Sequence, residues 1–197
     1  MIITVVTINP LVNIKPRETT KTARERPLFP RGRPHLIAVS KSVDAKRAVH
    51  ALLSHAGIDP AKTCFAQARV GGKVAAIEKN IKPDNEVIVI WNLPALVRYK
   101  VRSDQRVLKM MRELQLLAYD RQIAVIGVTE ATNFKYPIDR ERVAGSNIWT
   151  RFASTTAIVD PGSTPDTITA FLGAPNLAWQ EFDLALPAQP SGARKLS

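Results

Sequence analysis

The chain has 197 residues, 45% of them hydrophobic, which suits one large domain, or one domain with a tail, around a continuous core. Its 28 Lys and Arg exceed its 17 Asp and Glu, and the net charge of +11 favours a polyanionic partner through counterion release. One cysteine, Cys64, excludes an internal disulfide framework, and with three scattered histidines it makes no typical zinc spacing. We therefore expect a globular protein of the reducing cytoplasm without a metal site.

The N-terminal segment differs from the rest of the chain. Residues 2–8, IITVVTI, are β-branched and predict a strand; they are too short to span a membrane and make a poor signal peptide, so no membrane partner is expected. Residues 9–34 hold five prolines and seven basic residues, which predicts an extended arm. The arm would bind polyanions non-specifically through Arg17, Lys21, Arg24, Arg26, Arg31 and Arg33.

Beyond this arm, short hydrophobic runs alternate with segments of helical periodicity. The predicted strands are residues 35–40, 62–67, 85–93, 123–129 and 154–160, and residues 167–173 and 181–186 form a closing hairpin. The predicted helices are residues 42–57, 72–81 and 103–122. This alternation predicts an α/β fold with a mainly parallel sheet and antiparallel C-terminal strands. Ligands of such sheets bind beyond the carboxyl ends of the strands, here residues 39–40, 91–93 and 128–133.

Five segments in order carry a family resemblance. They are HLIAVSKSVDAKRAVHALLSHAGIDPAKTCFA, VIVIWNLPAL, SDQRVLKMMRELQLLAYDRQIAVIGVT, RVAGSNIWTRFASTTAIVD and GAPNLAWQEFDLAL. Together they resemble the later part of RecA-like P-loop ATPases, in the branch of the RepA-type replicative helicases (AAA family ATPases). The resemblance implies a RecA-like three-layer sandwich, incomplete at the N-terminal side, and a role in DNA replication or recombination. The expected organisation is a strand and basic arm at 1–34, a RecA-like core at 35–187 and a tail at 188–197.

The phosphate-binding motif of that superfamily is absent. G-x-x-x-x-G-K-[ST] wraps phosphates with backbone N–H groups, and the nearest segment, QARVGGKV at 67–74, has Gln67 and Val74 at essential positions. A glycine turn before a helix is the commoner role of such a segment. The resemblance implies that the chain begins after the family's first strand and P-loop. Residues 2–8 then either replace the lost strand or belong to an unrelated arm.

The Walker B position is also altered. In the most natural register Trp91 replaces the acidic residue and Asn92 follows it, and neither binds Mg²⁺ as a carboxylate does. Asp84 and Glu86 precede the strand, at its wrong end. We therefore expect no efficient ATPase activity. We expect the protein to bind ATP with Mg²⁺ only if another chain supplies a P-loop.

Polar residues after the later strands are weak candidates for a nucleotide site. Glu130 and Thr129 stand where relatives place a polar sensor, so they would contact a nucleotide or polarise a water; a solvated strand end is the commoner alternative. In the following loop, the resemblance implies that Arg142 or Arg151 contacts a neighbouring subunit's nucleotide or a polyanion. Ser146 and Asn147 of that loop are weak cofactor-binding candidates.

The segment RYKVRSDQR is the strongest nucleic-acid candidate. It stands where RecA-like proteins place a DNA-binding loop, and its cations with an interleaved tyrosine offer a phosphate track and a stacking face. The residues are Arg98, Tyr99, Lys100, Arg102 and Arg106. Within the following helix, Met110–Met111 and Leu114–Leu117 are expected to face the core.

Three functions remain open from the sequence. The first is a RecA-like protein that binds nucleic acid, most simply DNA, or a partner ATPase, with impaired hydrolysis. The second is an active ATPase or helicase subunit completed by a P-loop from another chain. The third is a structural module of a homo- or hetero-oligomer, because relatives form rings through heterologous contacts.

Overall fold

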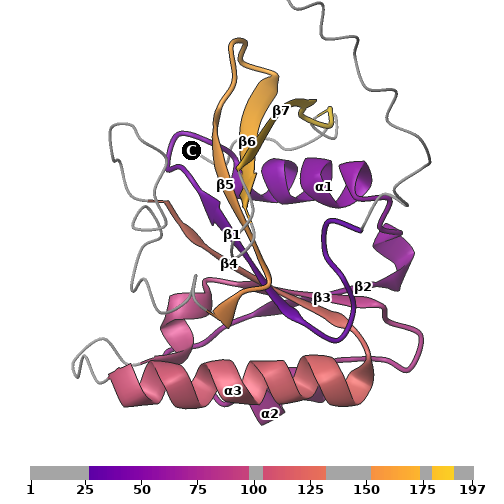
Figure 1. The fold of residues 1–197 in the computed structure, drawn as a ribbon, viewed down its shortest axis with the longest axis vertical. Helices are drawn as coiled ribbons and strands as arrows, with labels where there is room; N and C mark the ends of the chain where they lie inside the picture. The colour runs from indigo at the N-terminus through magenta and orange to yellow at the C-terminus, as the bar shows by residue number, and fades with distance from the viewer. Residues whose placement is uncertain (1–26, 98–103, 132–151, 174–178, 189–197) are drawn as a thin grey trace, which may run out of the picture.

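The computed structural model describes residues 27–97, 104–131, 152–173 and 179–188 (Figure 1). The strands are β1 Pro34–Val39, β2 Thr63–Gln67, β3 Val87–Trp91, β4 Ala124–Glu130, β5 Thr155–Pro161, β6 Thr167–Gly173 and β7 Gln180–Ala185. The helices are α1 Ala45–His55, α2 Val74–Glu78 and α3 Asp104–Arg121, with short 3₁₀ helices η1 Pro60–Lys62 and η2 Leu93–Leu96.

All seven strands form one sheet in the order β2-β3-β4-β1-β5-β6-β7. The first five in that order are parallel, whereas β6 and β7 run antiparallel to their neighbours. The central strand β1 pairs on both sides, with His35 opposite Ile126 of β4 and Thr155 of β5. The predicted α/β class, with a mainly parallel sheet and antiparallel C-terminal strands, is confirmed.

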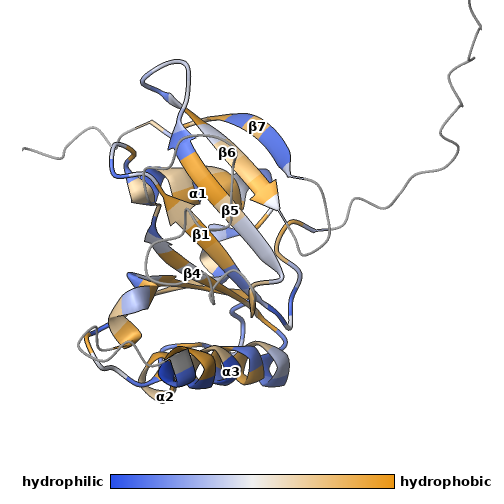
Figure 2. Ribbon diagram, turned by 60° about the vertical axis from the view of Figure 1, so that its left-hand side comes forward, coloured by the Kyte–Doolittle hydropathy of each residue, from blue (hydrophilic) through white to orange (hydrophobic). Residues whose placement is uncertain are grey.

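Two helical layers enclose the sheet, with α1 on one face and α2 and α3 on the other (Figure 1). The alternation of β1 builds both cores, since Leu36 and Ala38 pack on the α3 side and Ile37 and Val39 on the α1 side. In Figure 2 hydrophobic colour runs along the central strands, while α3 alternates between hydrophobic and hydrophilic turns. Strands buried on both faces are nearly continuous apolar runs, which is why the sequence marks them clearly.

The ends of the helices follow their local chemistry. Helix α1 begins after Asp44, whose side chain caps it, and ends before Gly57, which has a φ of 68° that favours glycine. Helix α2 is shorter than the predicted 72–81, because Lys73 precedes it without a side-chain cap and the backbone turns again at Asn80 and Ile81. The segment 67–74 contains a turn at Gly71, with a φ of 67°.

The last part of the predicted arm packs against the sheet. The Phe29 side chain is buried and lies edge-on to the His35 ring, with 5.4 Å between the ring centroids. The Thr155 hydroxyl of β5 donates to the Leu28 carbonyl. Residues 2–8 lie outside the described residues. In the described sheet each strand is hydrogen-bonded to its neighbours from β2 to β7, so this sheet has no interior gap that an additional strand would fill.

Helix α3 has a core face and an exposed face. Met110, Met111, Leu114 and Leu117 are buried as predicted. Leu116 is an exception to the predicted core-facing segment, because 59% of it is exposed. The periodicity of the helix explains this difference, since residue 116 points away from the face shared by 110, 114 and 117.

A close approach fixes the segment that follows β3. Leu93, the first residue of η2, lies against Gly127 of β4, and a Cβ at that glycine would collide with the Leu93 side chain. Glycine in a strand interior commonly marks such an approach. The contact brings the end of β3 down onto the α3 face of the sheet.

Candidate functional site at the carboxyl ends of the central strands

The carboxyl end of β1 lies where the strand order reverses. The chain leaves β1 through α1 towards β2 and later returns to its other side as β5. Ser40 N donates to the Val159 carbonyl, and Ala131 N donates to the Val39 carbonyl, so the end of β1 is fixed between both neighbours. Ligands of parallel α/β sheets bind outside such a reversal point.

The loop from β1 to α1 has the strand–loop–helix arrangement of a phosphate-binding loop. Aligned with G-x-x-x-x-G-K-[ST], the stretch that starts at Ser40 places Ala45 at the second glycine, Lys46 at the lysine and Arg47 at the metal-binding hydroxyl. The lysine position is therefore kept in the topologically appropriate loop. Both glycines and the hydroxyl at position 47 are replaced.

A side chain of the loop itself occupies the start of α1. The Asp44 Oδ1 atom accepts from Lys46 N at 3.0 Å and from Arg47 N at 3.2 Å. These N–H groups at a helix N-terminus, with the positive end of the helix dipole behind them, are the groups that would face a phosphate. The carboxylate thus takes the place of an external anion.

Further contacts close the rest of the loop. The Ser40 hydroxyl donates to Asp160 Oδ1 of β5, and Val43 N donates to the Ser40 carbonyl at 3.0 Å. The Lys41 Nζ atom lies 3.0 Å from Glu130 Oε1 at the end of β4. Three carboxylates, those of Asp44, Asp160 and Glu130, therefore border this loop.

Arg47 is directed away from the loop. Its Nε donates to the Pro187 carbonyl at 2.9 Å, and its Nη2 lies 3.3 Å from Asp166 Oδ1. These partners lie before β6 and after β7, so Arg47 joins the start of α1 to the antiparallel end of the sheet. At the position where the motif places a metal-binding hydroxyl, this chain places a structural cation.

The end of β3 carries an aromatic residue in place of an acid. The Trp91 ring stacks on Phe65 of β2 with 6.3 Å between centroids and 12° between planes, and Asn92 follows with a φ of 53°. Glu86 lies before β3, as expected, and pairs there with Lys62 and Arg31. The hydrogen bond from Lys62 is the main cause that lowers the pKa of the half-buried Glu86 carboxyl.

The structure describes three of the predicted site residues. Glu130 is exposed and pairs with Lys41, Thr129 is buried in β4, and Arg106 is exposed on the first turn of α3. Glu130 therefore lies beside the β1 loop, whereas Arg106 belongs to α3. Outside the described residues lie Arg98, Tyr99, Lys100, Arg102, Arg142, Ser146, Asn147 and Arg151.

The strand end at residues 39–40 was predicted as a possible ligand site, but the loop from Ser40 to Arg47 was not predicted to stand at the place of a phosphate-binding loop. Its signal was present, because a buried strand is followed by a short polar loop, an Asp cap and a lysine at the motif's distance. The glycines of the motif are found instead at 67–74, and the helix α2 that follows has only five residues. The reversal of strand order, which decides between the two segments, is visible only in the sheet.

Comparisons with known proteins support the fold. No protein-family model matches the chain, and no curated protein matches its sequence. The structure is similar to the RadB recombinase, with a TM-score of 0.52 and 12% identity over 74% of this chain and 82% of that chain. It is also similar to a DnaB-like replicative helicase described with its interactions with primase, with a TM-score of 0.51 and 11% identity. That match covers 80% of this chain and 56% of the helicase chain. The chain has a RecA-like fold.

Among the residues that the structure describes, no group of three or more His, Cys, Asp or Glu side chains could hold a metal ion. No helix in this part of the chain is long and apolar enough to cross a membrane.

Proposed function

We propose that this protein is a RecA-fold accessory factor of DNA replication or recombination that binds nucleic acid or a partner ATPase and does not hydrolyse ATP efficiently. The observation that carries the proposal is the Asp44 carboxylate on the Lys46 and Arg47 amides, at the position of a phosphate-binding loop. The β1–α1 unit is then the altered P-loop unit of the fold, retained in the chain. Its binding groups have become structural ones.

The chemistry of the loop supports this proposal. A triphosphate would have to displace the Asp44 carboxylate from the Lys46 and Arg47 amides, and the backbone holds that carboxylate close to them. It would also come close to the carboxylates of Glu130 and Asp160, which border the same loop. A magnesium ion would find Arg47 and Trp91 where the motif supplies a hydroxyl and a carboxylate. The residues of this loop therefore fit a self-capped helix better than a nucleotide with Mg²⁺.

Calorimetric titration with Mg-ATP tests the enzymatic part. The wild-type protein is expected to show no measurable binding, and an ATPase assay no turnover above a protein-free control. Asp44→Asn keeps a helix cap and removes the charge, so it is the variant in which weak triphosphate binding would first become measurable. Clear wild-type affinity for Mg-ATP that Lys46→Ala removes would overturn the proposal.

Binding of a labelled single-stranded oligonucleotide at several salt concentrations tests the other part. For a polyanion-binding site, the logarithm of the binding constant should fall linearly with the logarithm of the salt concentration. Without binding to single strands, to a duplex or to a co-expressed RecA-like ATPase, the proposed function fails as a whole.

A further inference from the structure

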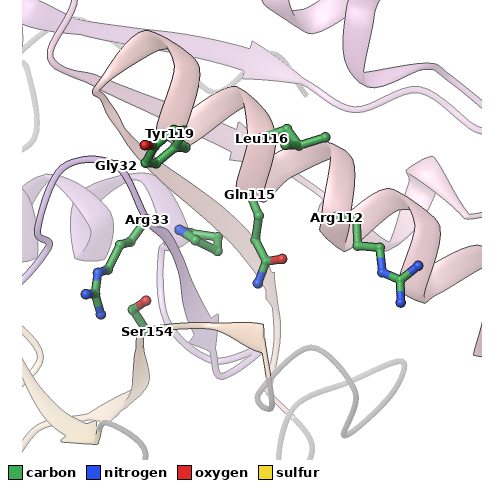
Figure 3. Close-up of a pocket in the computed structure, with 8 residues that line it drawn as sticks. Gly32, Arg33, Arg112, Gln115, Leu116, Tyr119 and Ser154 are labelled. Atoms are coloured by element: carbon green, nitrogen blue, oxygen red, sulfur yellow. The ribbon is translucent and has the colours of Figure 1, made fainter.

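An open recess lies at the end of the sheet opposite the β1 loop. It is about 480 Å³ in volume and lies between the amino ends of β1 and β5 and the second half of α3. Arg33 and Ser154 come from the strand side, and Arg112, Gln115, Leu116 and Tyr119 come from the helix (Figure 3). Nothing in the sequence interpretation joined these segments, which are far apart in the chain.

The arginines of this recess differ from most others that the structure describes. Arg31, Arg47 and Arg121 each pair with a carboxylate. Arg33 and Arg112 are exposed and have no ion pair with a described residue. Two guanidinium groups, each with several N–H donors, therefore border one recess without a carboxylate partner among the described residues.

The recess also gathers exposed apolar surface. Leu116 is 59% exposed and Tyr119 is 68% exposed, and they are two of the four large hydrophobic side chains exposed among the described residues. Tyrosine and arginine together are typical of binding surfaces, because both offer large contact area and directed hydrogen bonds. Tyr119 lies next to Gly32 at one end of the recess, and Arg112 lies at the other end (Figure 3).

The exposed face of α3 extends this surface towards the carboxyl end of the sheet. Lys109, Arg112, Leu116 and Tyr119 follow at spacings of three and four residues and so share one face, and Arg106 lies one turn before Lys109. The cations are about 4.5 Å apart along the helix axis, from a rise of 1.5 Å per residue. The helix also holds Asp104, Glu113 and Asp120; Glu113 follows Lys109 by four residues and so adjoins the cationic face, but none of the three lines the recess.

We propose that this recess, with the cationic face of α3, is a binding site for single-stranded nucleic acid. Arg33 and Arg112 hold backbone phosphates, Tyr119 stacks on a base, and the Gln115 amide meets a base edge. A regular row of cations ending at an accessible aromatic ring suits a ligand with regular charges and flat bases better than an acidic polypeptide. The site rests on the nucleic-acid part of the proposed function, and gives it described residues outside the segment 98–106.

Fluorescence anisotropy with labelled oligothymidylate on the full chain tests this site. In Arg33→Ala/Arg112→Ala, the slope of log affinity against log salt should fall by about 1.4, from roughly 0.7 per phosphate contact on a single strand. Tyr119→Ala should weaken binding about thirtyfold, the middle of the range for loss of one stacked base, whereas Tyr119→Phe should bind like the wild type. All three side chains are exposed, so the variants should fold normally.

The matched control is Lys79→Ala/Lys82→Ala. These lysines are exposed, have no ion pair with a described residue and do not line the recess, so the double variant removes the same charge elsewhere. It should leave the salt slope close to that of the wild type. If it lowers the slope as much as the arginine pair does, only the net charge matters and the site is wrong.

Two further outcomes separate this site from the proposed function. If the wild type binds oligothymidylate and the recess variants bind equally well, the site is overturned while the proposed function stands. If the wild type binds no nucleic acid, the site and the nucleic-acid part of the function fail together. Polyglutamate that competes as well as oligothymidylate, with Tyr119→Ala neutral, would identify an acidic polypeptide as the ligand and overturn the proposal.

Discussion

The two ends of the sheet treat charge in opposite ways. At the carboxyl end of β1, Asp44 accepts from the first amides of α1 and Lys41 pairs with Glu130, so these donors have partners within the chain. At the amino end, Arg33 and Arg112 have no carboxylate partner among the described residues. Topology marks where the fold can bind a ligand, whereas cations without a carboxylate partner among the described residues are the basis for the site that we propose in this chain.

The largest expected effect comes from the strand that joins both ends. Ile37 of β1 is fully buried, and Ile37→Ala should lower the free energy of unfolding by about 2–5 kcal/mol through lost burial and a cavity. Urea denaturation monitored by circular dichroism measures the change. Val70→Ala is the control, because Val70 is 75% exposed and its truncation should matter little. A change as small as that of Val70→Ala would contradict the assignment of Ile37 and β1 to the core between the two ends of the sheet.

The next effect concerns the amino end and depends on pH. Burial is the main cause that lowers the pKa of His35 from 6.5 to about 4; its hydrogen bond to the Pro30 carbonyl acts the other way, and Arg33 lowers it further. As the pH decreases from 6.5 to about 4, His35 is protonated in the unfolded chain but not yet in the folded protein. The free energy of unfolding therefore decreases as the pH decreases through that window. The total loss is about 3 kcal/mol, from 1.36 kcal/mol per pKa unit.

Urea midpoints measured between neutral and mildly acidic pH test the role of His35. His35→Gln should flatten the acid limb of the stability profile, because a neutral amide replaces the titrating ring. His55→Gln is the matched control on the surface of α1 and should leave that limb as in the wild type. An unchanged acid limb in His35→Gln would contradict the assignment.

A smaller effect sharpens the account of the carboxyl end. Asp44→Ala should lower stability by about 1 kcal/mol, the typical cost of losing an N-cap, whereas Asp44→Asn should lose much less. Thermal melts of the two variants measure this difference. Equal stability of wild type and Asp44→Ala would mean that the carboxylate does not fasten α1.

The smallest effect concerns the surface ion pair beside the loop. Lys41 and Glu130 are both well exposed, so Lys41→Ala or Glu130→Gln should change stability by less than about 1 kcal/mol. The double variant should differ little from either single one in the same denaturation assay. A coupling well above that value would indicate a shielded pair with a larger role at this end of the sheet.

The order of elements could be predicted from the sequence because each has a local signal. The largely apolar runs of β1 and β3 are buried on both faces, and α3 shows its core face through Met110 and Leu114. The hairpin of β6 and β7 was readable from two short alternating segments. Even the Asp44 cap has a local signature, since an acidic residue before a helical run satisfies its first amides.

The roles of these elements depend on contacts that are distant in sequence. Nothing local to β1 says that it lies between β4 and β5, so the loop at Ser40 could not be recognised as the reversal point. The recess joins Arg33, Arg112 and Ser154 from three separate segments. The burial of His35 likewise depends on Phe29 and on both neighbouring strands, and no periodicity in the sequence shows it.

The Asp44 cap has a consequence for how the folded state responds to its surroundings. A protein that binds nucleotide only when folded gains stability as nucleotide concentration rises. Here the anion at the start of α1 belongs to the chain, and the backbone fixes its local concentration beside the two amides. That local concentration does not change when the protein is diluted or when the nucleotide concentration changes. The melting temperature should therefore be the same with and without Mg-ATP, because the anion that caps α1 is part of the chain.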